Sequence, residues 1–336
     1  MQLGGVMKLR VATRKSALAL AQTTMAADAI VAANTASNAE LLTYELVSMT
    51  TEGDRRLDKS LASFGGKGVF IKELEVALLE NRADIAVHSL KDMPAEVLPQ
   101  FKLAAVLKRE DPRDAFISRG GAAGIRFMDL PSGARVGTGS IRRIVQLKAL
   151  RPDIEYVPIR GNIQTRISKL AELDGVVLAA AGLKRMGLAD QVTEYFSTEQ
   201  VLPASGQGIL AIETLADVDS RHPELHEGSC EISGNLAEIL AQANHVETFC
   251  VASAEMAYLK ALNAGCQFPV ASFAEFVSDD GAIARTLKIR GIYWDEKSEN
   301  LLCAEVSGNI DLNSADAVQQ SKQMGVALAQ EIQKQL

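Results

Sequence analysis

The feature that most constrains the fold is a repeated alternation of short apolar runs with longer helix-forming runs. The strands predicted in this way lie at 8–12, 41–49, 85–87, 134–136, 155–159 and 176–180, and the helices at 17–31, 70–81, 141–150 and 162–173. Ser16 is the expected N-cap of the first helix. Strands that alternate with helices favour an α/β fold with largely parallel sheets.

The pattern changes after Glu213. Residues 216–244 are acidic and polar, with few strand signals. A helix at 251–262, strands near 270–276, 287–294 and 301–306, and a last helix at about 314–336 then predict a small α+β unit. A chain of 336 residues is long enough for two or three such domains.

Charge and cysteine spacing exclude several classes of function. The net charge of -7 disfavours nucleic acid as a partner. The four cysteines show no C-x-x-C pair, so we expect no metal site. We see neither an apolar signal core nor a run of about 18 apolar residues, and therefore expect a cytoplasmic protein with reduced thiols and no membrane partner.

Cationic side chains gather where the chain turns from a predicted strand into a predicted helix. The four segments are Ala12–Ser16, Gly137–Arg143, Arg160–Asn162 continuing to Arg166, and Gly182–Arg185. The first turn of a helix offers unpaired N–H groups, and arginine matches a carboxylate with two parallel hydrogen bonds. One such segment alone is more often a capped, solvated helix start, but four together predict a ligand with many carboxylates. Phosphate is less favoured because no P-loop spacing occurs.

Two further residues have the chemistry of a site. Asp92 follows the buried strand at 85–87, where a carboxylate could stabilise a cation or move protons; a turn or N-cap aspartate is the simpler interpretation. Cys266 lies on a Gly-flanked loop, where a thiol is accessible, although it could equally be a loop cysteine without function. His88 alone is more typical of a hydrogen-bonded structural residue, and the other cysteines are interpreted as incidental or buried.

Several stretches together resemble the porphobilinogen deaminase (hydroxymethylbilane synthase) family. They are ATRKSALAL, GGKGVFIKELEVALLENRADIAVHSLKDMP, REDPRDAF, VGTGSIRR, RGNIQTRISKL, AGLKRMGL, LPASGQG and AGCQFPV. They follow one another in the family's order over nearly the whole chain, and the longest is about thirty residues long.

The resemblance implies an α/β fold with two domains like those of type II periplasmic binding proteins, a central cleft between them, and a small α+β C-terminal domain. The implied bounds are 1–108 plus about 206–228 for domain 1, 109–205 for domain 2, about 245–336 for domain 3, and about 217–244 for an acidic connecting insertion. Domain 3 carries the cysteine loop. A monomer is expected.

The resemblance also implies an activity. Four porphobilinogen units are condensed head to tail, with loss of ammonia, into hydroxymethylbilane, a precursor in tetrapyrrole (haem and chlorophyll) biosynthesis. The chain grows on a dipyrromethane cofactor held by a thioether to Cys266, and Asp92 matches the family's catalytic aspartate. No metal or nucleotide is required.

The residues implied for the site fall into three groups. Those expected to bind acetate and propionate groups are Arg14, Ser16, Lys67, Ser89, Lys91, Thr138, Ser140, Arg142, Arg143, Arg160, Arg166 and Arg185. Phe70 and Gln207 are expected at the cleft or its loop, and Asp92 and Cys266 carry the chemistry.

The chain departs from the family pattern at three positions. Ser63 replaces a lysine, Met256 replaces the arginine of an A-E-R triplet, and Ala264 replaces the first of two glycines before the cysteine. Alanine fits there if its φ is negative. The expected result is weaker cofactor contacts without loss of function. Two alternatives stay open: a non-catalytic anion- or solute-binding protein of the same fold, and a family member with impaired turnover.

Overall fold

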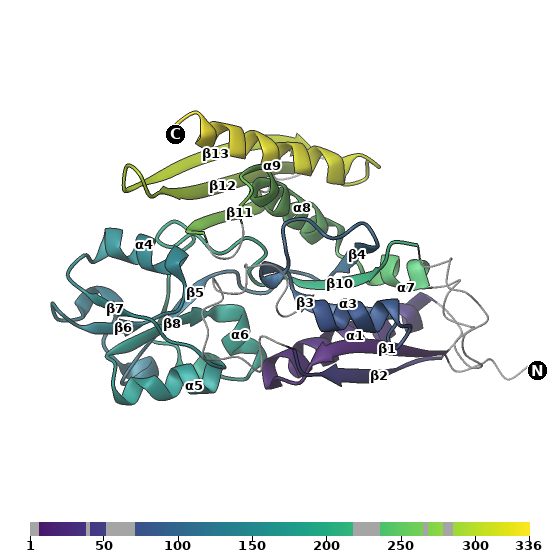
Figure 1. Ribbon diagram of the computed structural model, residues 1–336, viewed down its shortest axis with the longest axis horizontal. Coiled ribbons are helices and arrows are strands. Elements are labelled where there is room, and N and C mark those ends of the chain that lie inside the picture. The colour runs from purple at the N-terminus through teal and green to yellow at the C-terminus, as the bar shows by residue number, and fades with distance from the viewer. Residues whose placement is uncertain (1–6, 38–40, 52–70, 218–235, 265–267, 278–284) are drawn as a thin grey trace, which may run out of the picture. The chain divides into compact units, whose positions relative to one another are not determined.

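The computed structural model of the chain describes residues 7–37, 41–51, 71–217, 236–264, 268–277 and 285–336 (Figure 1). These residues form two compact units. The first holds the described residues of 7–108 and 209–249, and the second holds those of 109–208 and 250–336. Among them, no helix combines the length and the apolar composition needed to cross a bilayer.

The first unit is built on a five-stranded sheet with the order β2-β1-β3-β10-β4. Its strands are β1 (Met7–Arg14), β2 (Leu42–Met49), β3 (Ile85–Ser89), β4 (Phe101–Val106) and β10 (Leu210–Leu215), and its helices are α1 (Ala17–Ser37), α3 (Lys72–Leu79) and α7 (Leu236–Ala243). β1 pairs in parallel with both β2 and β3, whereas β10 is antiparallel to β3 and β4.

Helices cover both faces of this sheet. On one face, Val11 and Ile85 pack with Ile30 of α1 and with apolar residues of α7. On the other face, Ala12 packs with Leu74 of α3. The sheet is therefore buried on both sides, which explains its nearly continuous apolar strands.

The second unit contains a sheet of the same design, with the order β7-β6-β8-β5-β9. Its strands are β5 (Asp114–Ser118), β6 (Arg135–Gly137), β7 (Glu155–Val157), β8 (Gly175–Ala179) and β9 (Glu194–Tyr195), and its helices are α4 (Ile141–Leu150), α5 (Ile163–Ser168) and α6 (Ala180–Arg185). β7, β6 and β8 are parallel, and β5 is antiparallel to β8. Successive residues Phe116 and Ile117 enter cores on opposite faces, as the two-residue period of a strand requires.

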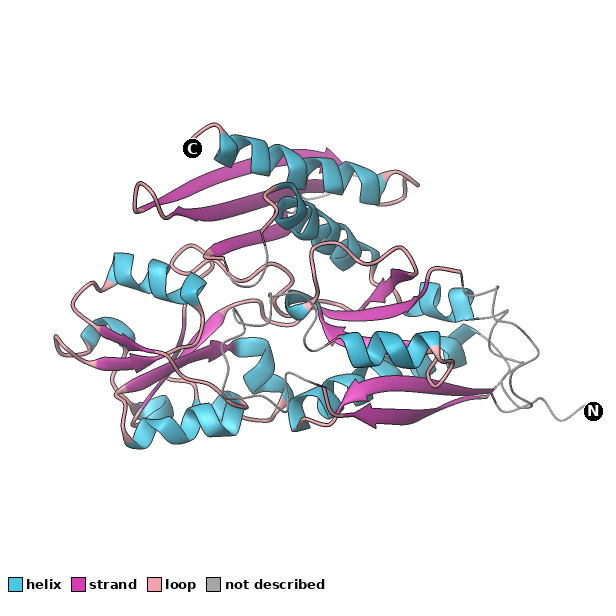
Figure 2. Ribbon diagram, viewed as in Figure 1, coloured by secondary structure: helices cyan, strands magenta, loops and turns pink. Residues whose placement is uncertain are grey.

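The C-terminal part of the second unit is an antiparallel sheet with two helices (Figure 2). It consists of β11 (Val270–Val277), β12 (Arg285–Asp295), β13 (Asn300–Ile310), α8 (Val246–Ala261, of which residues from 250 on belong here) and α9 (Ala317–Gln333). α9 lies along β12 and β13 (Figure 1). Gly325 lets α9 approach α8 closely, since a Cβ there would lie 2.0 Å from the Ala254 carbonyl oxygen.

The predicted fold class, two α/β domains and a small α+β C-terminal domain, is confirmed. The expectation of largely parallel sheets is wrong in detail, because each five-stranded sheet is mixed. The predicted helix at 162–173 ends as an α-helix at Ser168 and continues as a short 3-10 turn. The strands β4, β5, β9 and β10 have no counterpart among the predicted ones.

Candidate anion-binding and catalytic site

The predicted binding segments of the second unit lie at one edge of its sheet. β7, β6 and β8 are parallel neighbours, so their carboxyl ends meet at the same edge. The segments that follow them carry Thr138 to Arg143 after β6, Arg160 to Arg166 after β7, and Arg185 after β8. The fold thus brings together three of the four predicted cationic segments.

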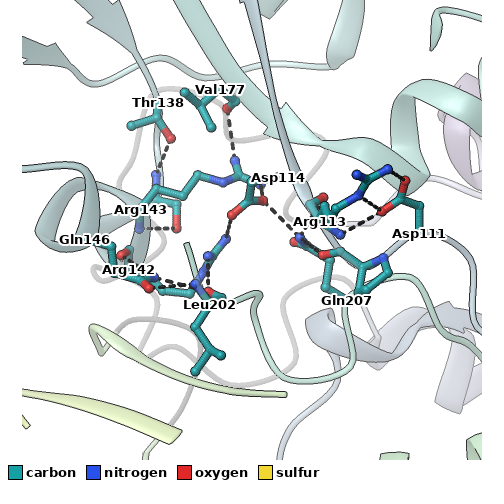
Figure 3. A network of polar contacts seen from close by, with 12 residues as sticks. Asp111, Arg113, Asp114, Thr138, Arg142, Arg143, Gln146, Val177, Leu202 and Gln207 are labelled. Atoms are coloured by element: carbon teal, nitrogen blue, oxygen red, sulfur yellow. Dashed lines mark hydrogen bonds and ion pairs between the residues drawn. The ribbon is translucent and has the colours of Figure 1, made fainter. Parts of the chain in front are cut away.

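The tandem arginines Arg142 and Arg143 converge on one buried carboxylate, Asp114 (Figure 3). Nη2 of each arginine lies 2.7 Å from an oxygen of Asp114, Arg142 at Oδ2 and Arg143 at Oδ1. All three side chains are at least nine-tenths buried. Ser140 caps the helix that bears the arginines, because its Oγ accepts the Arg143 backbone N–H at 3.4 Å.

The electrostatics of this cluster favour the ionised carboxylate. Burial alone would raise the pKa of Asp114, but the charges of Arg142 and Arg143 hold it far below its ordinary value. Gln207 adds a hydrogen bond from Nε2 to Asp114 Oδ1 at 2.9 Å. Thr138 is buried beside this helix start, and its Oγ1 accepts the Ser140 N–H at 3.4 Å.

Gln207 belongs to a segment, residues 202–208, that is anchored by hydrogen bonds to the C-terminal sheet domain. Glu255 of α8 accepts the Gly206 N–H at 2.6 Å and the Ala274 N–H of β11 at 2.7 Å, and it pairs with Arg109 at 2.7 Å. Arg109 in turn donates from Nε to the Gln207 carbonyl at 2.9 Å. A continuous polar chain therefore runs from α8 to the arginine pair.

The segment after β7 is capped and tightly turned. Asn162 accepts the Thr165 N–H at 2.8 Å, and Arg166 donates from Nε to the Gly161 carbonyl at 2.8 Å. Gly161 has φ of 99°, a conformation that favours glycine. Arg160 is exposed at this edge.

The fourth cationic segment lies differently from the prediction. Lys184 and Arg185 are in the last turn of α6, so they do not extend a helix N-terminus. Burial lowers the pKa of Arg185 to about 10 against the opposing charge of Glu110. Arg185 donates from Nη2 to the Gly208 carbonyl at 2.6 Å, while its Nε is buried and has no hydrogen-bond partner in the part of the chain that the structure describes.

In the first unit, the predicted residues lie at the carboxyl ends of two neighbouring parallel strands, β1 and β3. Arg14 ends β1, and Ser16 caps α1 by accepting the Ala19 N–H at 3.3 Å. Ser89 ends β3 and donates to Gln22 Oε1 at 3.1 Å. These ends form a second polar edge, built on the same principle as that of the second unit.

Asp92 ends a short 3-10 turn, Leu90–Asp92, directly after β3, and its side chain is exposed; Lys91 beside it is half-buried. His88 of β3 is hydrogen-bonded, as expected, with its Nε2 3.0 Å from Glu213 Oε2 of β10. Because this pair is buried, it anchors the strand that leads to Asp92.

Four of the sequence-predicted positions, Cys266, Lys67, Phe70 and Ser63, lie outside the described residues. Ala264 is described and is not among the residues with positive φ, so alanine fits there. Asn263 before it takes the left-handed conformation, with φ of 49°. Met256 is half-buried on α8, next to Glu255.

Sequence reasoning missed Asp114, Glu255 and Arg109. Asp114 stands in REDPRDAF at the start of an apolar run, and a carboxylate that begins a buried strand needs a cationic partner. That signal was available. No such signal marks the partners of Glu255, because they lie 19, 49 and 146 residues away in the sequence.

Comparison with known proteins decides the family. A model described as "Porphobilinogen deaminase, dipyromethane cofactor binding domain" matches residues 9–222, and one for the C-terminal domain of the same family matches residues 249–334. The chain belongs to the porphobilinogen deaminase family. A porphobilinogen deaminase is a transferase, and the first of these models is named for the domain that binds its dipyrromethane cofactor.

Curated porphobilinogen deaminases resemble the chain over almost its full length. That of Syntrophus aciditrophicus is 43% identical over 90% of this chain and 90% of its own length. That of Clostridium botulinum is 39% identical over 98% of this chain and 100% of its own. Among solved structures, a Salmonella typhimurium periplasmic binding protein covers 70% of the chain and 92% of its own length at 16% identity, with a TM-score of 0.37, too low to add to the fold assignment.

Proposed function

We propose that this porphobilinogen deaminase joins four porphobilinogen units into hydroxymethylbilane by using Asp92 as its catalytic residue and Cys266 as the attachment point of dipyrromethane. The single observation that supports a site for acid-bearing ligands is the arginine pair on Asp114. Two buried guanidinium groups share one carboxylate, and Arg143 Nε is buried with no hydrogen-bond partner among the described residues. Such a cluster suits the acetate and propionate groups of pyrroles.

The residues of the two polar edges take distinct roles in this proposal. The cationic and hydroxyl residues of both edges bind and orient pyrrole acid groups; they are Arg14, Ser16, Ser89, Lys91, Thr138, Ser140, Arg142, Arg143, Arg160, Arg166 and Arg185, together with Lys67 outside the described residues. Phe70 and Gln207 line or shape the site. Dipyrromethane, when bound, supplies the free pyrrole α-carbon to which substrate is added.

Asp92 acts on the incoming substrate. Ammonia leaves the aminomethyl group of porphobilinogen, which makes the pyrrole ring cationic, and an exposed carboxylate beside the ring stabilises that charge. A carbon–carbon bond then forms, and the α-proton departs to a base, for which Asp92 is suited. Asp92 follows β3 directly, and β3 is a parallel neighbour of β1, the strand that ends at Arg14, which supports a shared role for these residues.

We further propose the domain bounds that the resemblance implies, namely 1–108 plus about 206–228, 109–205 and about 245–336, with 217–244 as an acidic insertion. A cytoplasmic monomer without nucleic-acid or membrane partners completes the proposal. The net charge of -7 supports the absence of a nucleic-acid partner, because such a surface repels polyanions.

Intact-mass measurement of the denatured protein tests the function. After reconstitution with porphobilinogen, the wild type is expected to carry a covalent dipyrrole on the tryptic fragment that contains Cys266 and to release hydroxymethylbilane. Asp92→Ala is expected to keep the dipyrrole and to lose nearly all turnover. A bare-chain mass in active preparations would refute the role of Cys266, and normal turnover in the variant would refute that of Asp92.

A further inference from the structure

The charges of the arginine pair do not balance. Arg142 and Arg143 contribute two positive charges, and Asp114 contributes one negative charge. Within the described part of the chain, neither arginine forms an ion pair with any other carboxylate. The carboxylate of the neighbouring Asp111 is paired instead with Arg113 and Lys184. One net positive charge is therefore enclosed, with both arginine side chains at most 6% exposed.

The two arginines differ in their remaining contacts. Arg142 donates from Nη1 to the Leu202 carbonyl at 2.6 Å. Gln146 holds the same residue, since it accepts the Leu202 N–H at 2.7 Å and donates to its carbonyl at 3.1 Å. Leu202 packs against β11 and β12 of the C-terminal sheet domain. Arg142 thus fastens the 202–208 segment.

Arg143 has a different environment. It donates from Nη1 to the Val177 carbonyl at 3.1 Å and from Nη2 to Asp114 at 2.7 Å. Its Nε is buried, and no residue of the described ranges accepts a hydrogen bond from it. An unsatisfied buried donor on a charged group is costly, which indicates a partner that is not part of the described chain.

We infer that Asp114 is a positioning residue that neutralises one of the two charges, so that the arginine pair binds one ligand carboxylate, with Arg143 as its contact and Arg142 as the counter-charge of Asp114. This inference rests on the proposed function and sharpens it. Without Asp114, two guanidinium groups on adjacent residues would repel each other and attract two anions. Gln207 keeps the shared carboxylate in place through its bond to Oδ1.

Charge-rescue variants distinguish these roles. Arg142→Gln leaves Arg143 neutralised by Asp114, and Arg143→Gln removes the contact itself, so each is expected to reduce dipyrrole loading about tenfold or more. Adding Asp114→Asn to Arg142→Gln restores one net positive charge on Arg143 and is expected to recover most of the loading. Adding it to Arg143→Gln is expected to recover none.

Loading is measured by intact mass after exposure to porphobilinogen, and circular dichroism reports folding. Asp114→Asn alone is expected to make the loaded enzyme about tenfold more sensitive to inhibition by acetate, because the pair then carries two charges. Asp153→Asn is the matched control: it removes a carboxylate paired with Arg151 at 2.8 Å at an exposed site, and wild-type sensitivity is expected.

Three results would each overturn the inference: equal rescue of both arginine variants, rescue of neither, or unchanged acetate inhibition in Asp114→Asn. If Asp114→Asn does not fold, the comparison of the two double variants still decides, since Asp114→Asn with Arg142→Gln preserves the net charge. The wild type reports separately on the proposed function: absence of a dipyrrole and of product there refutes the function, whatever the variants do.

Discussion

Glu255 is the residue whose replacement should weaken the second unit most clearly. Its carboxylate is fully buried, and its two oxygens accept from three residues: the Arg109 guanidinium at 2.7 Å, the Gly206 N–H at 2.6 Å and the Ala274 N–H at 2.7 Å. Glu255→Gln keeps the shape of the side chain, but it removes the charge and turns one acceptor into a donor.

The expected loss of stability follows from the arginine charge that stays buried when its carboxylate partner is removed. Breaking a buried ion pair by removing one partner costs about 3–5 kcal/mol, because the remaining charge stays buried. Arg109 keeps part of its stabilisation, since it still donates to Gln207 and lies 4.8 Å from the centre of the Phe273 ring. We therefore expect a loss of about 3 kcal/mol, at the lower end of that range. For a unit of this size, that corresponds to a fall in Tm of about 6–12 °C.

Calorimetry of the holoenzyme measures this effect, with Glu172→Gln as the matched control. Glu172 is an exposed partner of Lys169 at 3.7 Å, so the same exchange is expected to leave Tm unchanged. A Tm of Glu255→Gln that equals that of the control, or a loss below about 1 kcal/mol, would show that the carboxylate does not hold these elements together.

Three further outcomes are expected. Burial opposes ionisation of Asp111, but hydrogen bonds from Arg113 and Lys184 lower its pKa from 3.8 to about 2. The ionised carboxylate therefore stabilises the fold by about 2 kcal/mol above pH 4, and this contribution is lost as the pH falls toward 2. In urea titrations the difference in stability between wild type and Asp111→Asn should close over that range, and a difference that does not depend on pH would contradict this expectation. His88→Leu leaves Glu213 buried without its partner at 3.0 Å and should lower the free energy of unfolding by about 3 kcal/mol in urea, whereas a change within 0.5 kcal/mol, as is typical of surface substitutions, refutes the anchoring role. Gly139→Ala places a Cβ 2.6 Å from the Ile159 carbonyl oxygen and should cost about 1–3 kcal/mol in thermal unfolding, with a wild-type Tm as the contrary result.

Local patterns predicted the elements that position the site. The strand predicted at 8–12 occurs as β1, which extends to Arg14, and Ser16 caps the next helix as expected, because capping and periodicity are local properties. The strand β10 escaped prediction, since it joins its sheet between β3 and β4, elements more than a hundred positions earlier in the sequence. Pairings over such distances leave no periodic signal in one sequence.

The cationic segments show which part of the site one sequence can reveal. Their positions correctly predict that arginines gather at strand ends, but they do not show which of these charges another residue already compensates. In the structure, Arg142 and Arg143 already share Asp114, and Arg185 lies at the end of a short helix. Which charges are compensated depends on partners from other elements, and only the fold identifies them.

The contacts of neighbouring residues also show what the departures from the family pattern change. Met256 stands where the family has arginine, but the contacts that join α8 to the 202–208 segment are made by its neighbour Glu255. Ala264 stands where the family has glycine, but the left-handed residue of that turn is Asn263. Neither replacement removes a group on which the described network depends. The polar chain from Glu255 through Gln207 to Asp114 and the arginine pair is therefore complete, and any effect of these departures should appear in cofactor contacts and not in the stability of the fold.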